Sequence, residues 1–317
     1  MMFFRIRTAL LLAAGLFPPL AFCAAKGKSE IVLPFRNLQG EMVVTMSLHG
    51  HKGMNFIVDT GFGTTMLDAS AAAAAHVKVW PLTSPPLQSA AGAIPLTQCA
   101  PHTRIEGYGL RLSGNAVVGD LQELQKGMGI PLAGILGFDS LEQFPFLVDY
   151  SASTITINPP KLQQGIEVPM EPPIPNEFNG PIIGLVIELP DGRRVETNLI
   201  IDTGSTEGLA LHAPFVERYG LQPAAEAKTV SELTYGGAYS VTPGSVRALL
   251  LGDQRVEDLQ PTYTTSAVGV SGNKRIDGEI GYKILSRFRI FMDAPHHVVV
   301  FEPASREDAA LPTSVLP

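Results

Sequence analysis

The sequence predicts an all-β protein of two homologous β lobes, related by a pseudo-twofold axis and carrying few short helices. Three observations predict this class: the chain contains an internal repeat, its apolar runs are short and end at turn residues, and helical periodicity is sparse. Glycine (31) and proline (26) are plentiful among the 317 residues, which favours short strands and turns over long helices.

The internal repeat is the strongest of these observations. Residues 54–61 and 197–204 are identical at five of eight positions, and each segment contains Asp-Thr-Gly, beginning at Asp59 and Asp202. Residues 134–150 and 278–294 share five of seventeen positions. The offsets of the two blocks, 143 and 144 positions, are nearly equal. Two blocks in the same order at one spacing predict two copies of a single structural unit.

Each copy leads into Asp-Thr-Gly through two apolar runs separated by a polar turn, which predicts a β-hairpin. We expect an N-terminal lobe over residues 26–158, a proline-rich connection over 159–180, a C-terminal lobe over 181–303 and a tail over 304–317. Part of the connection, around residues 166–170, is expected to pair with a sheet. Alanine-rich residues 67–77 predict a helix, and single helical turns are expected near 141–144 and 284–288.

The N-terminus predicts a secretory signal peptide over residues 1–25. Arg5 and Arg7 precede an apolar run over residues 9–22, and small residues follow at positions 24 and 25. We therefore expect an exported protein, periplasmic or secreted. Two alternatives would place it at a membrane: an uncleaved signal, or lipidation at Cys23, because residues 20–23 loosely resemble the bacterial lipoprotein box, although Phe22 is bulkier than that box prefers.

Composition and charge exclude several classes of function. The net charge is -7 and no basic stripe is present, which argues against nucleic-acid binding. No His, Cys or acidic set has convincing zinc spacing, so we expect no metal and no cofactor. Signal cleavage would leave Cys99 as the single thiol, which excludes an internal disulfide.

The two Asp-Thr-Gly segments are the candidates for catalysis. A lone Asp-Thr-Gly is most simply a hairpin turn. Here each follows an apolar strand at the same place in its repeat, so a pseudo-twofold arrangement would bring Asp59 and Asp202 face to face. Two carboxylates a few Å apart cannot both ionise cheaply, and they share a proton. One can then act as base towards a water while the other protonates a carbonyl, which is what peptide hydrolysis requires.

These motifs resemble those of the pepsin/retropepsin (retroviral-type) aspartyl protease family. Apolar-apolar-Asp-Thr-Gly is followed in each half by a second motif like that family's apolar-apolar-Gly, and the similarity covers roughly residues 30–303. The second motif reads Ile135-Leu136-Gly137 in the first half and Glu279-Ile280-Gly281 in the second. The resemblance implies that this motif packs against the strand that bears the catalytic Asp. It also implies a peptide or protein substrate, and two halves in one chain favour a monomer.

Residues next to the two aspartates are expected to support them. We expect the Thr hydroxyls to hydrogen-bond across the lobe interface, and the Gly residues to permit a tight turn and present an N–H group to a carboxylate. The hydroxyl that follows the second Asp-Thr-Gly is expected to reach the outer oxygen of Asp202. The supporting residues are Thr60, Gly61, Thr203, Gly204 and Ser205.

The resemblance further implies flaps that close over the substrate. Ala91-Gly92 and Gly236-Gly237 lie at equivalent places in the repeat, and aromatic Tyr235 precedes the second. Gly92, Tyr235, Gly236 and Gly237 are therefore the candidate flap residues. The alternative interpretation is an ordinary glycine-rich surface hairpin.

Two residues depart from the family pattern. Phe62 follows the first Asp-Thr-Gly where a Ser, Thr or Ala is usual, and Glu279 stands where an apolar residue is expected. Glu279 either faces solvent or adds a third acid near the centre, where it would raise nearby pKa values. The departures leave open a second hypothesis, a catalytically weak or inactive peptide-binding module on the same fold.

Overall fold

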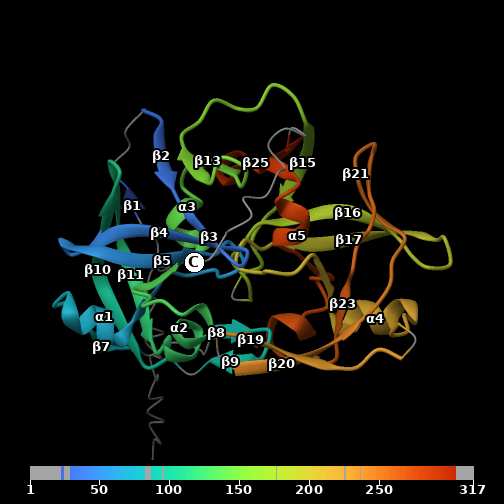
Figure 1. Cartoon of the computed structure of the whole chain (residues 1–317), viewed down its shortest axis with the longest axis horizontal. Coiled ribbons are helices and arrows are strands. Elements are labelled where there is room, and N and C mark those ends of the chain that lie inside the picture. The colour runs from blue at the N-terminus through green and yellow to red at the C-terminus, as the bar shows by residue number, and fades with distance from the viewer. Residues whose placement is uncertain are drawn as a thin grey trace, which may run out of the picture.

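The computed structural model describes residues 23–24, 29–82, 87–94, 96–175, 177–224, 226–235 and 237–304. Most of the predicted signal peptide and nearly all of the predicted tail lie outside the described residues. The two halves of the chain stand side by side, the first in blue to green and the second in yellow to red (Figure 1). Within the described part of the chain, no helix is long and apolar enough to cross a membrane.

The first half is built on one mixed sheet, in the order β1-β11-β6-β12-β5-β4-β10-β7, with β3 paired to β4. Its strands are β1 (Cys23–Ala24), β3 (Arg36–Leu38), β4 (Glu41–Leu48), β5 (His51–Val58), β6 (Met66–Asp68), β7 (Trp80–Pro81), β10 (Gln98–Gly107), β11 (Leu110–Gly119) and β12 (Gly134–Leu136). A separate hairpin consists of β8 (Leu87–Ser89) and β9 (Gly92–Ile94).

The second half repeats this arrangement. Its strands are β16 (Ile182–Glu188), β17 (Arg194–Ile201), β18 (Leu209–Leu211), β19 (Val230–Thr234), β20 (Gly237–Pro243), β21 (Ala248–Leu251), β22 (Gln254–Val256), β23 (Thr262–Thr264) and β24 (Gly278–Ile280). The order β23-β18-β24-β17-β16 matches β11-β6-β12-β5-β4 of the first half. The directions match as well, because β12 runs parallel to β5 and β24 runs parallel to β17. Both sequence repeats therefore fold into the same unit.

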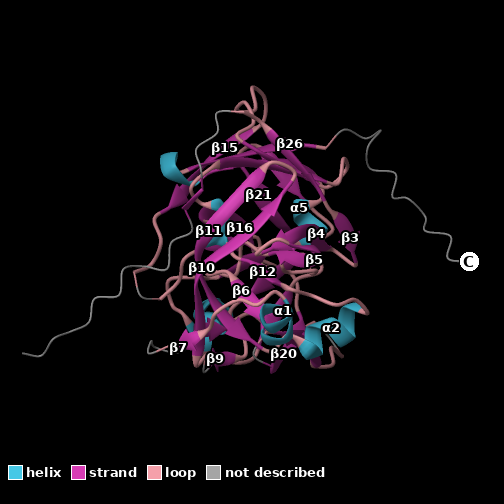
Figure 2. Ribbon diagram, turned by 90° about the vertical axis from the view of Figure 1, so that its left-hand side faces the viewer, coloured by secondary structure: helices cyan, strands magenta, loops and turns pink. Residues whose placement is uncertain are grey.

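A further set of strands joins the halves, in the order β15-β26-β25-β13-β14-β2 (Figures 1 and 2). They are β2 (Ile31–Pro34), β13 (Pro145–Asp149), β14 (Thr154–Ile157), β15 (Ile166–Glu171), β25 (Phe288–Asp293) and β26 (Val298–Pro303). β13 of the first half pairs antiparallel with β25 of the second, and Leu147 lies opposite Phe291, its counterpart in the repeat. Equivalent residues facing each other are what a pseudo-twofold axis between the halves requires. β15, from the predicted connection, pairs with both β26 and β16.

Helices are few and short in the described residues. They are α1 (Ala69–Ala74), α2 (Gln122–Met128), α3 (Phe138–Leu141), α4 (Ala213–Tyr219), α5 (Tyr282–Leu285) and the 3₁₀ turns η1 (Gly269–Gly272) and η2 (Ala294–His296). The helix predicted over 67–77 is shorter than expected. Residues 66–68 are strand β6, and the Asp68 side chain caps the helix by accepting hydrogen bonds from the N–H groups of Ser70 and Ala71. Helices α2 and α4 were not predicted from the sequence. They end at Gly129 and Gly220, which adopt the left-handed conformation.

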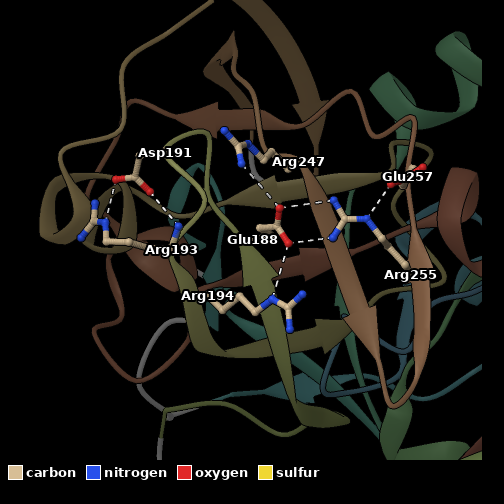
Figure 3. Close-up of polar contacts among 7 residues, drawn as sticks. All are labelled: Glu188, Asp191, Arg193, Arg194, Arg247, Arg255 and Glu257. Atoms are coloured by element: carbon tan, nitrogen blue, oxygen red, sulfur yellow. Dashed lines mark hydrogen bonds and ion pairs between the residues drawn. The ribbon is translucent and has the colours of Figure 1, made fainter.

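An ion cluster ties two hairpins of the second half together (Figure 3). Glu188, at the end of β16, accepts a 2.7 Å hydrogen bond from Arg255 of β22, and Arg194 and Arg247 lie 3.5 and 3.8 Å away. The hydrogen bond from Arg255, followed by the positive charges of Arg255 and Arg194, holds the pKa of Glu188 below its usual value. The cluster fixes β21–β22 against β16–β17, on whose strand end Asp202 lies.

Candidate active site

The two aspartates stand at the ends of equivalent strands. Asp59 follows β5, and its N–H group donates a 3.0 Å hydrogen bond to the carbonyl of Leu136. Asp202 follows β17 and donates in the same way, at 3.0 Å, to the carbonyl of Ile280. The apolar second motif of each half therefore anchors the backbone of its Asp, as the resemblance implied.

The two threonines exchange hydrogen bonds between the halves. The Thr60 hydroxyl donates to the carbonyl of Ile201 at 2.6 Å, and the Thr203 hydroxyl donates to that of Val58 at 2.9 Å. Each hydroxyl also accepts from the other threonine's backbone N–H group, at 3.0 and 3.1 Å. Both side chains are fully buried. This reciprocal network holds the two Asp-Thr-Gly turns at one fixed separation.

The two glycines bring each turn against the opposite carboxylate. A methyl group on Gly61 would overlap the carboxyl carbon of Asp202, and one on Gly204 would overlap that of Asp59. A hydrogen bond joins the two carboxyl groups. The pair also accepts backbone hydrogen bonds: Asp59 from Phe62 at 3.0 Å and Asp202 from Gly204 at 2.8 Å.

This environment keeps a proton on the pair. Burial raises the pKa of Asp59 well above its usual range, and the negative charge of Asp202 raises it further. Burial also raises the pKa of Asp202, while its backbone hydrogen bonds, that from Gly204 first, oppose the shift. Two carboxyl groups this close release their protons in two coupled steps.

Comparison with known proteins shows which family the chain belongs to. The profile of the family described as aspartyl protease matches twice, over residues 44–140 and 187–284, together more than half of the chain. The chain belongs to the aspartyl protease family. Among solved structures, the crystal structure of the aspartic proteinase from Irpex lacteus is similar, with a TM-score of 0.51 and 14% identity, over 87% of this chain and 98% of that one. A comparison with curated protein sequences found no match.

Asp59 and Asp202 line a cavity of about 260 Å³ that hairpins of both halves also line. The flap candidates lie at or beside the tips of β8–β9 and β19–β20, except Gly236, which is outside the described residues. The Tyr235 ring packs edge-on against Phe62 of the first half, with centroids 6.1 Å apart. A methyl group on Gly237 would lie 3.9 Å from Cβ of Ala91, so the two hairpin tips meet. They lie side by side where the halves adjoin (Figure 1).

The structure shows what surrounds Phe62 and Glu279, the two residues that depart from the family pattern. Phe62 packs its ring against Tyr235, and its backbone N–H group donates a hydrogen bond to the Asp59 carboxylate. Glu279 is a third acid at the centre, because it lines the same cavity as Asp59 and Asp202. Burial and then the charge of Asp202 raise its pKa to about 8. Ser205 differs from its predicted role: its side chain hydrogen-bonds to Glu279, and its backbone N–H group is what reaches Asp202.

Sequence reasoning missed a fourth acid, Glu41, which begins β4 and lines the same cavity. Burial, and then the charge of Asp202, raises its pKa to about 8. The only signal in the sequence was an acidic residue directly before an apolar strand, which is more often solvent-exposed. Among the described residues, no group of three or more His, Cys, Asp or Glu side chains has an arrangement that could hold a metal ion.

Proposed function

We propose that this aspartyl protease is an aspartic endopeptidase that hydrolyses peptide bonds with a water activated by Asp59 and Asp202. One observation carries the proposal: two hydrogen-bonded carboxyl groups, held by a reciprocal threonine network, line a cavity between the lobes. The family supports a protease-type function, and this geometry supplies the two groups that such a reaction needs.

The chemistry follows from the shared proton. The ionised carboxylate of the pair takes a proton from a water lying between the two groups, and the water attacks the peptide carbonyl. The protonated carboxyl donates its proton to the carbonyl oxygen, so no charge builds up on the tetrahedral intermediate. The carboxyl group that took its proton from the water then gives that proton to the departing amine, while the other, now ionised carboxylate takes a proton from a hydroxyl of the intermediate. The C–N bond breaks, an acid and an amine leave, and the pair is again singly protonated. The backbone N–H groups around each Asp keep both carboxyl groups oriented throughout.

The segment ahead of the lobes supports a site of action outside the cytoplasm, through the predicted signal peptide of residues 1–25. Each Asp-Thr-Gly turn comes from the same chain, so one copy carries a complete dyad. We therefore propose an exported, monomeric enzyme that acts on peptides or unfolded proteins.

The test is cleavage of a denatured protein substrate from about pH 3 to 7, the range over which a coupled carboxylate pair titrates. Asp59→Asn and Asp202→Asn should each abolish cleavage, because either change removes the shared proton system. Asp191→Asn is the matched control, since Asp191 lies on an exposed hairpin turn where it bonds to Arg193. A statine-type inhibitor should block the wild type.

Cleavage that persists in either dyad variant of a clean preparation would refute the proposal. A folded wild type that binds peptides across the acidic range but leaves them intact would favour the second hypothesis, a peptide-binding module on the same fold.

A further inference from the structure

The two walls of the central cavity are formed by equivalent hairpins of the repeat, β8–β9 through residues 88–90 and β19–β20 through Glu232, Thr234, Tyr235 and Tyr239. In the first-half hairpin Leu87 pairs with Ile94, and in the second-half hairpin Glu232 pairs with Tyr239. The pairs at the tips, residues 89–92 and 234–237, correspond in the same way. An apolar pair in one flap therefore occupies the place of an acid and a phenol in the other.

The turns and strands next to the two aspartates show the same contrast. Phe62 and Ser205 each follow their Asp-Thr-Gly. Ile135 lies beside β5 at the register that Glu279 holds beside β17. Four of these pairs of equivalent positions carry an apolar residue in the first half and a polar or acidic one in the second, whereas Ser89 and Thr234 at the tips are both polar. Of the four apolar residues, Phe62 lines the central cavity itself. Two like walls would favour similar substrate side chains on both sides of the dyad. Because the two walls differ, we expect them to favour different side chains.

The first-half wall is continuous with apolar surface. Phe62, Leu87 and Ile135 belong to one hydrophobic cluster. Phe62 and Leu87 also line a neighbouring cavity of about 400 Å³, whose other walls include Ile174 and Phe178. This side of the dyad can bury a large apolar side chain.

The central cavity is acidic, and four of its six acids come from the second half. The acids that line the central cavity are Glu41, Asp59, Asp202, Glu207, Glu232 and Glu279. No Lys or Arg side chain among the described residues lines it. Its one His, His212, is kept neutral because burial lowers its pKa to about 4. Lys283 lies 2.5 Å from Glu207. Burial raises the pKa of Glu232, and this shift is opposed by a 2.8 Å hydrogen bond from the Tyr239 hydroxyl and by the charge of Lys283.

Two lining groups also lack a hydrogen-bond partner. Oε2 of Glu41 is shielded from solvent and has no partner, and the same is true of the hydroxyl of Ser271, which is fully buried in η1. Buried polar groups are normally paired. An acceptor left open in an acidic cavity is suited to a ligand that brings positively charged N–H donors.

We propose that the cleft selects peptides that carry a basic side chain, Lys or Arg, on the side of the scissile bond facing Glu279 and Glu232, and an apolar side chain on the other side. The inference rests on the proposed function and specifies its substrate class. A cation that enters beside Glu279 favours the ionised carboxylate, so binding a basic side chain releases a proton from the wall. Phe62 and Leu87 receive the apolar neighbour.

The experiment is cleavage of a positional octapeptide library, with the cut sites read by mass spectrometry. Lys or Arg should be preferred over Leu by about tenfold or more at one position flanking the cut, equivalent to about 1.4 kcal/mol. Glu279→Ile and Glu232→Leu copy the residues of the opposite wall, Ile135 and Leu87, and each should move that preference towards apolar side chains. Glu167→Gln, in an exposed ion pair with Lys161, is the matched control and should leave the profile unchanged.

The possible outcomes separate a failure of this inference from a failure of the proposed function. Efficient cutting between two apolar residues, with no basic preference, would overturn the inference and leave the proposed function intact. If nothing is cut, the proposed function fails, and fluorescence polarisation still tests the cleft with paired octapeptides that differ in Lys or norleucine at one position. Tighter binding of the Lys peptide, lost in Glu232→Leu, would support the acidic wall, and equal binding would refute it. Glu232→Leu also serves if Glu279→Ile fails to fold.

Discussion

Replacing Thr203 with Val is the sharpest test of how the two halves are held together. Valine has nearly the same shape, so the change removes the hydroxyl and leaves the packing alone. The lost contacts are a 2.9 Å hydrogen bond to the carbonyl of Val58 and a 3.0 Å hydrogen bond from the N–H group of Thr60.

The magnitude follows from what is left behind. The Val58 carbonyl loses a donor and the Thr60 N–H group loses its acceptor, in a place fully closed to solvent. Each unsatisfied buried group costs about 1–3 kcal/mol, so the free energy of unfolding should fall by about 2–6 kcal/mol. That is a large share of the 5–15 kcal/mol typical of a folded protein. Activity should fall as well, because the network sets the separation of the two aspartates.

The assay is urea unfolding followed by far-UV circular dichroism. Thr203→Ser keeps the hydroxyl and should recover most of the loss. Thr103→Val is the matched control, because Thr103 is equally buried and makes one 2.7 Å hydrogen bond within a single half, to Ala100. If Thr203→Val costs no more than Thr103→Val, the network does not hold the halves together, and the reasoning is refuted.

Three further predictions concern pH, the turns and the flap. Burial raises the pKa of Asp139 from 3.8 to about 7, so the folded state holds this proton more tightly than the unfolded state does. Its contribution to the free energy of unfolding is therefore complete below the unfolded pKa and is lost as the pH rises to about 7, with a slope of up to about 1.4 kcal/mol per pH unit. In Asp139→Asn the free energy of unfolding, measured in urea at each pH, should depend less steeply on pH, and an unchanged slope would contradict this. In Gly204→Ala the new methyl group would overlap the Asp59 carboxyl, so peptide cleavage should fall at least about hundredfold, and near-normal cleavage would show that the turn is not so close. Tyr235→Phe removes a hydroxyl that hydrogen-bonds the backbone at Asp120, so KM should rise about fivefold with a smaller change in kcat, whereas an unaltered KM would mean that this contact does not hold the flap.

Much of the fold could be predicted because it is encoded locally and twice. Apolar runs of strand length end at turn residues, and their repetition predicted two homologous β lobes, which the family match and the structural similarity confirm. The short apolar runs could not reveal which distant strand each would meet. The pairing of β13 with β25 joins residues about 140 positions apart, and no local pattern specifies such a partner.

The sequence by itself predicted the pair Asp59 and Asp202, because two copies of one motif at one spacing come face to face when a twofold axis relates the two halves. Only the tertiary structure decided what surrounds the pair. Whether Glu279 faces water or the dyad depends on how the second half folds around it, and Glu41 of the first half meets the charge of Asp202 from the second. A residue's identity fixes its ordinary pKa, but the folded surroundings set the cost of ionising it, and they come from segments far apart in the sequence.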